Sequence, residues 1–245
     1  TPFQNEKSCE LLDALVGESG AHFETAGALD GGRSTFITMA LPEDMVFDGR
    51  DGQPDRSRWM IAALNSHDGT SAFRFLVTNI RIVCANTQTA ALASAKASFS
   101  IRHTQGGHGL IAQARDALKL TYRYMAEFER QAAELYARSI TVEEVTTFAH
   151  SLFGVSDAPS AASARTRSEH AAKVVQLFRS SPTIAPIAGT RWGAYNAVTE
   201  YTDHVQRVAG ARTAAAASHA RALRALTSGS TQKLKSDAFT ALCAL

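Results

Sequence analysis

The stretch SRWMIAALNSHDGTSAFRFLVTNIRIVC, residues 57–84, decides the fold because it contains two runs rich in aromatic and β-branched residues. Asp68-Gly69 lies between the runs, and both residue types tolerate the positive φ that a tight hairpin turn requires. The stretch HFETAGALDGGRSTFITMAL, residues 22–41, has the same arrangement around Asp30-Gly31-Gly32. The two stretches therefore predict two consecutive β-hairpins in an antiparallel sheet.

The segments around the hairpins complete the expected sheet. PEDMVFDGRDGQPDR, residues 42–56, is rich in Pro, Gly and Asp and predicts a loop. SFSIRHT, residues 98–104, predicts a further strand. ANTQTAALASAKA, residues 85–97, predicts a short helix that Asn86 or Thr87 can cap, because a short side-chain oxygen accepts from the free amides of the first turn. We therefore expect four to five antiparallel strands.

The strongest helical pattern covers residues 108–139. Apolar residues recur there every three or four positions, while Arg115, Lys119, Arg123 and Arg130 lie outside the apolar stripe. This helix should pack its apolar face on the sheet and leave a basic face free. A shorter amphipathic helix is expected before the hairpins, over residues 3–16.

Helices alone are expected in the C-terminal part. Thr141 and Glu144 form a capping-box pattern that opens a helix through Phe153. Residues 154–167 contain Pro159 and a small polar run, and they predict a flexible connector. The expected fold class is α+β: an antiparallel β-meander of four to five strands packed by a long helix, followed by a helical part. The expected divisions are a core at residues 1–153, the connector, and a C-terminal part at residues 168–245 with helices at 168–180, 190–210 and 231–244.

The composition is that of an ordinary globular protein, with 245 residues, 45% hydrophobic and 20% charged. No apolar run approaches the roughly 18 residues of a membrane helix, and the start lacks a signal-peptide pattern, so we expect a cytoplasmic protein without a membrane partner. Because the chain begins with Thr1 rather than Met, a segment is expected upstream of it. Cys9, Cys84 and Cys243 lie far apart, which argues against a disulfide framework or a zinc knuckle.

Charge is distributed unevenly along the chain. Residues 1–55 hold three basic and eleven acidic residues, a balance of −8, whereas the remainder carries a balance of +10. An acidic front and a basic body indicate a surface for a polyanion on the body. The competing interpretation is that Arg-rich, Ala-rich usage reflects a GC-rich genome.

His67 and Asp68 place an imidazole next to a carboxylate, and two interpretations of this pair remain open. The pair can supply ligands to a metal-dependent nuclease or phosphohydrolase, which would recruit a further His such as His103, His108 or His204. The spacing of these residues shows no fixed ligand pattern. The following Gly69 instead favours a hairpin turn, so we assign no metal site.

Other catalytic patterns are weak. Cys84 precedes an expected helix and follows a basic strand, which can activate a thiol, but a strand-end cysteine is more often buried. The chain lacks the Gly-rich phosphate-binding motifs of nucleotide enzymes, and HTQGGHG, residues 103–109, fits a turn between strand and helix. We assign no catalytic residue and no cofactor.

Basic and aromatic residues are interleaved on the expected sheet and on the long helix. Arginine and lysine neutralise phosphates, and exposed aromatic rings stack on bases, a combination suited to single-stranded nucleic acid. Strand aromatics also belong commonly to a core. The expected nucleic-acid-binding residues are Arg58, Arg74, Arg81, Lys96, Arg102, His103, Lys119 and Arg123.

Three motifs carry a family resemblance: NSHDGTSA at residues 65–72, IRIVCANTQTAAL at 80–92 and GTRWGAYNAVTEYTDH at 189–204. With them the chain resembles the phage/plasmid-like protein family of prokaryotes, a domain of unknown function found on mobile elements. The resemblance runs from about Phe3 to the C-terminus and implies DNA handling, although the family offers no established catalytic residues. A meander followed by a long helix is also similar, at the level of fold, to single-strand annealing proteins such as Red-beta and RecT, which form rings or filaments on DNA.

These observations lead us to expect a single-stranded DNA-binding protein that self-assembles into a ring or filament and anneals strands without ATP in phage or plasmid recombination. The alternatives are the metal-dependent enzyme and a non-enzymatic partner-binding protein of a mobile element. The motif residues are first expected to be structural, fixing a hairpin, a strand end and a helix that docks internally or on a neighbouring subunit. They are Asn65, Ser66, His67, Asp68, Gly69, Asn86, Thr87, Trp192, Asn196, Glu200, Tyr201, Asp203 and His204.

Overall fold

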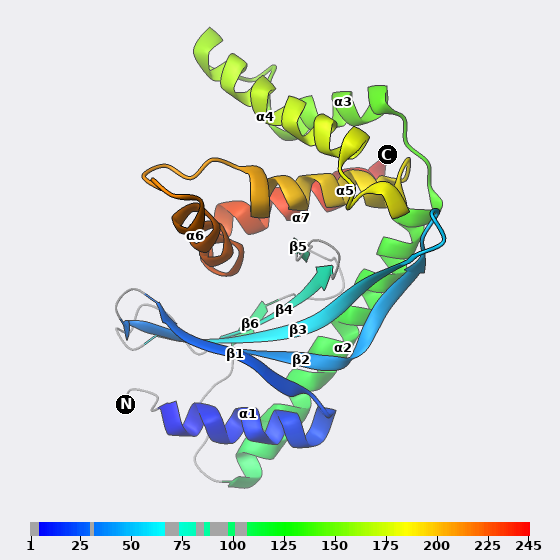
Figure 1. The fold of residues 1–245 in the computed structure, drawn as a ribbon. Coiled ribbons are helices and arrows are strands. Elements are labelled where there is room, and N and C mark those ends of the chain that lie inside the picture. The colour runs from blue at the N-terminus through cyan, green and yellow to red at the C-terminus, as the bar shows by residue number, and fades with distance from the viewer. Residues whose placement is uncertain (1–4, 30–31, 67–73, 82–85, 89–97, 101–106) are drawn as a thin grey trace. The chain divides into compact units, whose positions relative to one another are not determined.

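The fold is known from a computed structural model that describes residues 5–29, 32–66, 74–81, 86–88, 98–100 and 107–245 (Figure 1). It confirms the α+β class, with an antiparallel sheet followed by a helical C-terminal part. The chain divides into two compact units. Unit 1 comprises residues 1–45, 57–80 and 92–128, and unit 2 comprises residues 46–56, 81–91 and 129–245.

The sheet follows chain order, β1-β2-β3-β4-β5, with β6 paired to β4. The first expected hairpin is confirmed, because β1 pairs antiparallel with β2 from His22 opposite Ala40 to Leu29 opposite Ser34. The expected turn at Asp68-Gly69 lies outside the described residues. The strands are β1 (His22–Leu29), β2 (Ser34–Asp48), β3 (Pro54–Ser66), β4 (Arg74–Arg81), β5 (Asn86–Gln88) and β6 (Ser98–Ser100).

Two helices belong wholly or largely to unit 1. The short helix α1 (Asn5–Ser19) buries Leu11, Leu12 and Leu15. The long helix α2 (Gly107–Ala137) confirms the strongest pattern in the sequence, and its residues up to Phe128 lie in unit 1. Trp59 of β3 meets the rings of Tyr124 and Phe128 of α2 edge-on, with centroids 6.1 and 5.4 Å apart, a geometry that aromatic pairs prefer. These buried rings join the long helix to the sheet.

The expected loop at residues 42–56 was wrong over most of its length. β2 continues to Asp48 and β3 begins at Pro54, so the chain turns only between them. Met45 is buried, and Phe47 stacks on Tyr136 with centroids 5.0 Å apart. Apolar residues at alternate positions thus keep the segment extended despite its Pro and Gly content.

The expected helix at residues 85–97 was also wrong at its start. Asn86 and Thr87 lie in β5 rather than capping a helix, and residues 89–97 lie outside the described part of the chain. The backbone of the segment is therefore used for sheet pairing at the position where a helix cap was expected.

Unit 2 is mainly helical. Thr141 and Glu144 form the expected capping box, with the Thr141 hydroxyl 3.2 Å from the Glu144 amide and the Glu144 carboxylate 2.8 Å from the Thr141 amide. The helix that follows the expected connector begins at residue 161 rather than 168, after Ser160 as its N-cap. The elements are α3 (Val142–Leu152), α4 (Ala161–Ser180), the 3₁₀ turn η2 (Ala185–Ile187), α5 (Arg191–Glu200), the π-helical turn η3 (Tyr201–Val205), α6 (Ala214–Thr227) and α7 (Gly229–Ala244).

Helix α5 is the centre of unit 2, because every residue from 192 to 200 is buried. Trp192 contacts the ring of Phe47, and Tyr195 contacts Phe239 of α7. A helix that is buried all round belongs to a core rather than to a surface. The single helix expected over residues 190–210 is in fact α5 followed by the π-helical turn, and α6 was missed.

No helix in the described ranges is long and apolar enough to cross a membrane.

Candidate nucleic-acid interface

Three cations form a stripe on α2, at Arg115, Lys119 and Arg123. They are spaced four residues apart, so they lie on one side of the helix and rise by about 6 Å per step. All three are exposed, and the Lys119 side chain retains 79% of its accessible surface. We call these residues the α2 stripe. It presents a row of positive charge that a phosphate backbone can follow.

Two cations of the α2 stripe have acidic neighbours. Arg115 donates two hydrogen bonds to Glu18 of α1, at 2.9 and 3.2 Å, and the bond holds the pKa of Glu18 below its usual value. Lys119 lies 3.3 Å from Asp116. Exposed pairs of this kind are weak and are screened by salt, so a polyanion can replace the carboxylates.

The cations on the sheet are less accessible to a phosphate backbone than those of the α2 stripe. Arg58 lies 3.2 Å from Glu24, which also contacts His22, and the Arg58 side chain is 44% exposed. Arg74 is half-buried at the start of β4, opposite Ser100 of β6. Of the nucleic-acid-binding residues expected on the sheet, Arg58 and Arg74 are thus partly accessible.

Several residues singled out from the sequence lie outside the described residues. They comprise part of the expected nucleic-acid set and the residues of the hairpin tip, so their roles stay predictions: Lys96, Arg102, His103, His67, Asp68 and Gly69.

Arg81 does not belong to an exposed nucleic-acid surface, and its assignment there is corrected. Its guanidinium Nε donates to the Asp55 carboxylate at 2.6 Å, and both side chains are fully buried. Trp192 Nε1 donates to the other oxygen of the same carboxylate at 3.3 Å. The arginine thus neutralises an internal acid at the end of β4, where phosphate has no access.

Asp55 is the acceptor in this buried cluster. Burial raises the pKa of Asp55 above its ordinary value, and the nearby Arg81 charge opposes that shift. The cluster joins the start of β3, the end of β4 and helix α5, so it brings together two of the three sequence motifs. Sequence reasoning missed Asp55 because an isolated Asp after Pro54 carries no local signal of burial.

The residues of the third motif lie inside unit 2, with one exception. Trp192, Asn196, Glu200 and Tyr201 are buried, whereas His204 is exposed. The Asn196 amide donates to the Trp192 carbonyl at 2.9 Å. These contacts dock α5 inside unit 2. Internal docking was one of the two roles expected for the motif, the other being contact with a neighbouring subunit.

A second buried ion pair follows α5. Lys235 of α7 donates to both oxygens of Asp203 in the π-helical turn, at 2.7 and 2.8 Å. Burial lowers the pKa of Lys235, and the Asp203 carboxylate opposes that shift. The pair ties η3 to α7 and uses a lysine for internal packing.

Tyr201 and His170 form a further internal contact. The Tyr201 hydroxyl hydrogen-bonds His170 Nδ1, and the Phe153 ring meets Tyr201 edge-on with centroids 5.8 Å apart. Burial raises the pKa of Tyr201 to about 12. The tyrosine therefore keeps its proton at any physiological pH.

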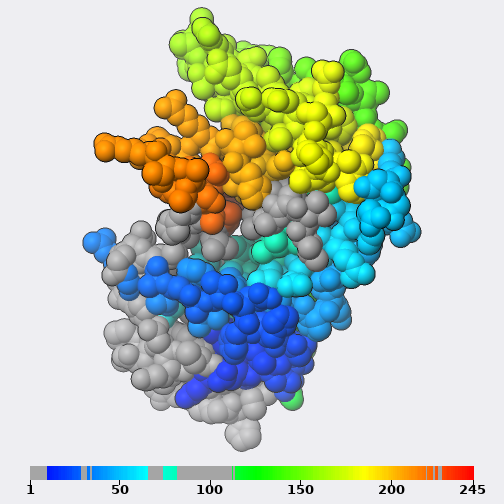
Figure 2. Space-filling model, viewed as in Figure 1, coloured from blue at the N-terminus to red at the C-terminus, as the bar shows by residue number. Residues whose placement is uncertain are grey.

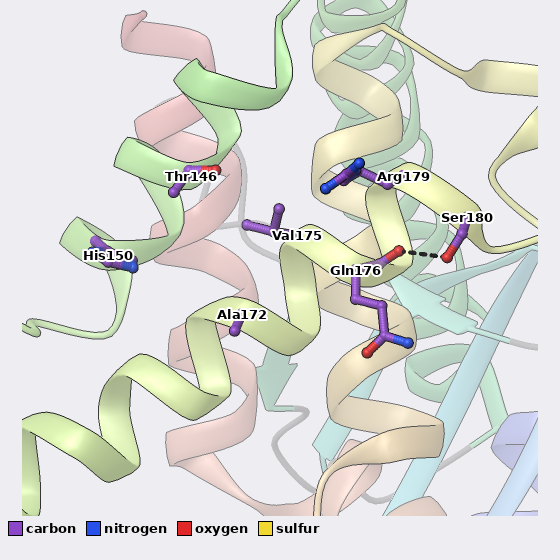
Figure 3. Close-up of a pocket in the computed structure, with 7 residues that line it drawn as sticks. All are labelled: Thr146, His150, Ala172, Val175, Gln176, Arg179 and Ser180. Atoms are coloured by element: carbon purple, nitrogen blue, oxygen red, sulfur yellow. Dashed lines mark hydrogen bonds between the residues drawn. The ribbon is translucent and has the colours of Figure 1, made fainter.

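A groove of about 510 Å³ lies between α3 and α4 (Figure 3). His150 of α3 and Arg179 of α4 are exposed along it, and Val175 and Ala172 line it between them. The Ser180 hydroxyl donates to the Gln176 carbonyl at 2.9 Å. None of these lining side chains is acidic, so the groove offers no carboxylate for metal or proton chemistry.

Among the described residues, no group of three or more His, Cys, Asp or Glu side chains is arranged to hold a metal ion. His67 and Asp68 lie outside these ranges, so the metal-dependent alternative stays a prediction.

The described molecule is thus an α+β protein whose helix α2 carries a row of exposed cations. The family model described as Domain of unknown function (DUF932) matches residues 1–227. Because this match covers most of the chain, the protein belongs to that family. Neither the curated proteins nor the solved structures yield a match. Family membership assigns no activity and no residue role.

Proposed function

We propose that this protein binds single-stranded DNA. The observation that supports the proposal most directly is the α2 stripe, in which Arg115, Lys119 and Arg123 are exposed at one-turn intervals along a rigid helix. Each cation that meets a phosphate releases condensed counterions, which makes binding favourable at low salt and weaker at high salt.

The preference for single strands rests on an aromatic ring beside the stripe. Tyr122 follows Lys119 by three residues and is half-buried, so part of its ring remains accessible to a base. Trp59 and Phe75 on the strands are fully buried and cannot stack on DNA. Tyr122 is therefore the helix residue that we propose for base stacking.

The proposal extends to strand annealing by a self-assembled ring or filament in a phage or plasmid setting. Base pairing itself drives annealing once a protein holds phosphates neutralised and bases accessible, so no nucleotide hydrolysis is needed. The absence of Gly-rich phosphate-binding motifs from the sequence is compatible with such a process.

Fluorescence anisotropy with a labelled single-stranded oligonucleotide tests the binding proposal. The triple variant Arg115→Gln, Lys119→Gln, Arg123→Gln should bind at least about tenfold more weakly than the unaltered protein at low salt. A matched variant removes three exposed cations from α4: Arg165→Gln, Lys173→Gln and Arg179→Gln. Its net charge equals that of the α2 triple variant, but it should bind nearly as well as the unaltered protein.

Equal losses in the two triple variants would show that only net charge matters, and the α2 stripe would then have no special role. Annealing is tested separately, with complementary oligonucleotides that carry a donor and an acceptor dye, in the absence of ATP. Cleavage of the oligonucleotide after addition of Mg²⁺ or Mn²⁺ would instead favour the metal-dependent enzyme.

A further inference from the structure

Residues 204–236 form the most one-sided charged segment of the chain. They include six Lys or Arg residues and no Asp or Glu. The segment runs from the end of η3 through α6 into the first half of α7, and all of it lies in unit 2. Figure 2 shows its orange atoms at the surface. We call it the basic segment.

Three of the six cations contact groups within unit 2. Lys235 is buried against Asp203, and Lys233 lies 2.7 Å from Asp237, one turn further along α7. Arg221 of α6 donates to the Asp203 carbonyl at 3.1 Å and to the Gln206 carbonyl at 3.5 Å. These contacts fix α6 beside the π-helical turn, so the segment has a defined shape.

The other three cations are Arg207, Arg212 and Arg224. Arg207 and Arg212 are exposed and Arg224 is half-buried, and none of them pairs with a carboxylate among the described residues. Arg207 follows Gln206, whose carbonyl meets Arg221, and Arg224 lies one turn beyond Arg221 on α6. Each of these two arginines thus lies close in sequence to a residue that this hydrogen bond holds, and its charge is not compensated by a carboxylate of the described residues.

We propose that the basic segment is a second contact for the phosphate backbone of single-stranded DNA, made by Arg207, Arg212 and Arg224. The inference rests on the proposed function and adds a site in unit 2 to the α2 stripe of unit 1. Uncompensated guanidinium groups repel one another, and a polyanion relieves that repulsion while it releases counterions. Arginine also matches phosphate geometry with two parallel hydrogen bonds.

The surroundings of the arginines favour a nucleic acid over a protein partner. Protein interfaces depend on a buried apolar or aromatic centre. Within the described part of the basic segment, Val205 is the only large hydrophobic side chain that is exposed, at 40%. Alanine and glycine fill most positions between Arg207 and Arg221, so few side chains stand between the guanidinium groups and a ligand.

The experiment compares the full chain with the triple variant Arg207→Gln, Arg212→Gln, Arg224→Gln in anisotropy titrations with a labelled single-stranded oligonucleotide. Affinity at low salt should fall at least about tenfold. The slope of log affinity against log salt concentration should become shallower by about 2, since about 0.7 is lost for each phosphate contact with a single strand. Circular dichroism and thermal melting should match those of the unaltered protein.

Two controls separate this inference from the proposed function. The α4 triple variant removes the same number of charges from unit 2 and should keep its affinity and salt slope. If the unaltered protein binds and the basic-segment variant keeps its affinity within about twofold and its slope unchanged, the inference is overturned while the proposed function stands. If the unaltered protein does not bind at low salt, both are overturned.

Discussion

Charged residues play opposite roles in two regions of this molecule. Inside unit 2, Arg81 and Lys235 are each held within 2.7 Å of a carboxylate and are almost or fully excluded from solvent. The cations of the α2 stripe are exposed, and so are Arg207 and Arg212 of the basic segment. The same residue type therefore contributes to folding in one place and is available to a ligand in the other.

The difference shows that counting basic residues along a sequence overestimates a binding surface. A buried cation is already committed to its carboxylate, and removing either partner leaves the other charge in a poorly solvating interior. An exposed cation costs the fold little when it is removed. Substitutions of the two classes should accordingly separate stability from binding.

The largest effect is expected for Asp55→Ala. The substitution leaves the Arg81 guanidinium buried without its carboxylate and removes the acceptor of Trp192, so the free energy of unfolding should fall by about 3–5 kcal/mol. Urea denaturation measures the loss. Glu169→Ala, which removes an exposed carboxylate that pairs with Arg165, is the matched control and should change stability by less than about 0.5 kcal/mol.

The double variant Asp55→Leu, Arg81→Met sharpens this test, because it removes both charges and fills the space with apolar groups. It should be less destabilised than Asp55→Ala alone. If Asp55→Ala and Glu169→Ala behave alike, the buried cluster does not hold unit 2 together.

A smaller loss is expected for Lys235→Met. Methionine keeps most of the side-chain volume but leaves the Asp203 carboxylate without its ammonium partner, and we expect a loss of about 2–3 kcal/mol. Lys233→Met, two residues away and exposed, is the control and should be nearly neutral. Chemical denaturation of both variants under identical conditions decides between an internal and a surface role for Lys235.

A third prediction concerns Tyr201 and pH. The folded-state pKa of about 12 lies above the ordinary value of 10.0, so the unfolded chain loses this proton first. The contribution of Tyr201 to the free energy of unfolding is therefore fully present below pH 10. It falls by up to about 2 kcal/mol as pH rises from 10 to 12. The difference in unfolding free energy between the unaltered protein and Tyr201→Phe should shrink over that range. A constant difference would contradict the burial of the phenol.

Features with local signals were predicted well from the sequence. The hydrophobic period of α2, the capping box at Thr141 and the hairpin of β1 and β2 depend on residues close to one another in sequence. The strand content of residues 42–56 was missed because Pro42 and Gly49 suggest a loop, whereas contacts of Phe47 with Tyr136 and Trp192 stabilise an extended chain. Those contacts join residues far apart in sequence.

The buried cluster around Asp55 could not be predicted, because its contacts also join residues far apart in sequence. Asp55 meets Arg81 across 26 residues and Trp192 across 137, and no local pattern distinguishes Arg81 from an exposed strand arginine. Helix α6 was missed because its first half is mainly alanine, which has a high helix propensity but no amphipathic pattern. A count of charge sign over residues 204–236 would have found the basic segment from the sequence alone.

The smallest effect on the free energy of unfolding is expected for the two triple variants that should weaken DNA binding most. Removing the three cations of the α2 stripe, or Arg207, Arg212 and Arg224, should change the free energy of unfolding by less than about 0.5 kcal/mol per site. Thermal melting of the two triple variants checks this expectation. A large drop in melting temperature would place these cations in the same class as Arg81 and Lys235.

The salt dependence of single-stranded DNA binding by the unaltered chain tests the central claim most directly. Anisotropy titrations between about 50 and about 200 mM salt should give measurable binding at the lower concentration and a linear fall of log affinity with log salt, with a slope of about −2 or steeper. Absence of binding at low salt, or binding that does not change with salt, would contradict the claim that the exposed cations of this protein contact a phosphate backbone.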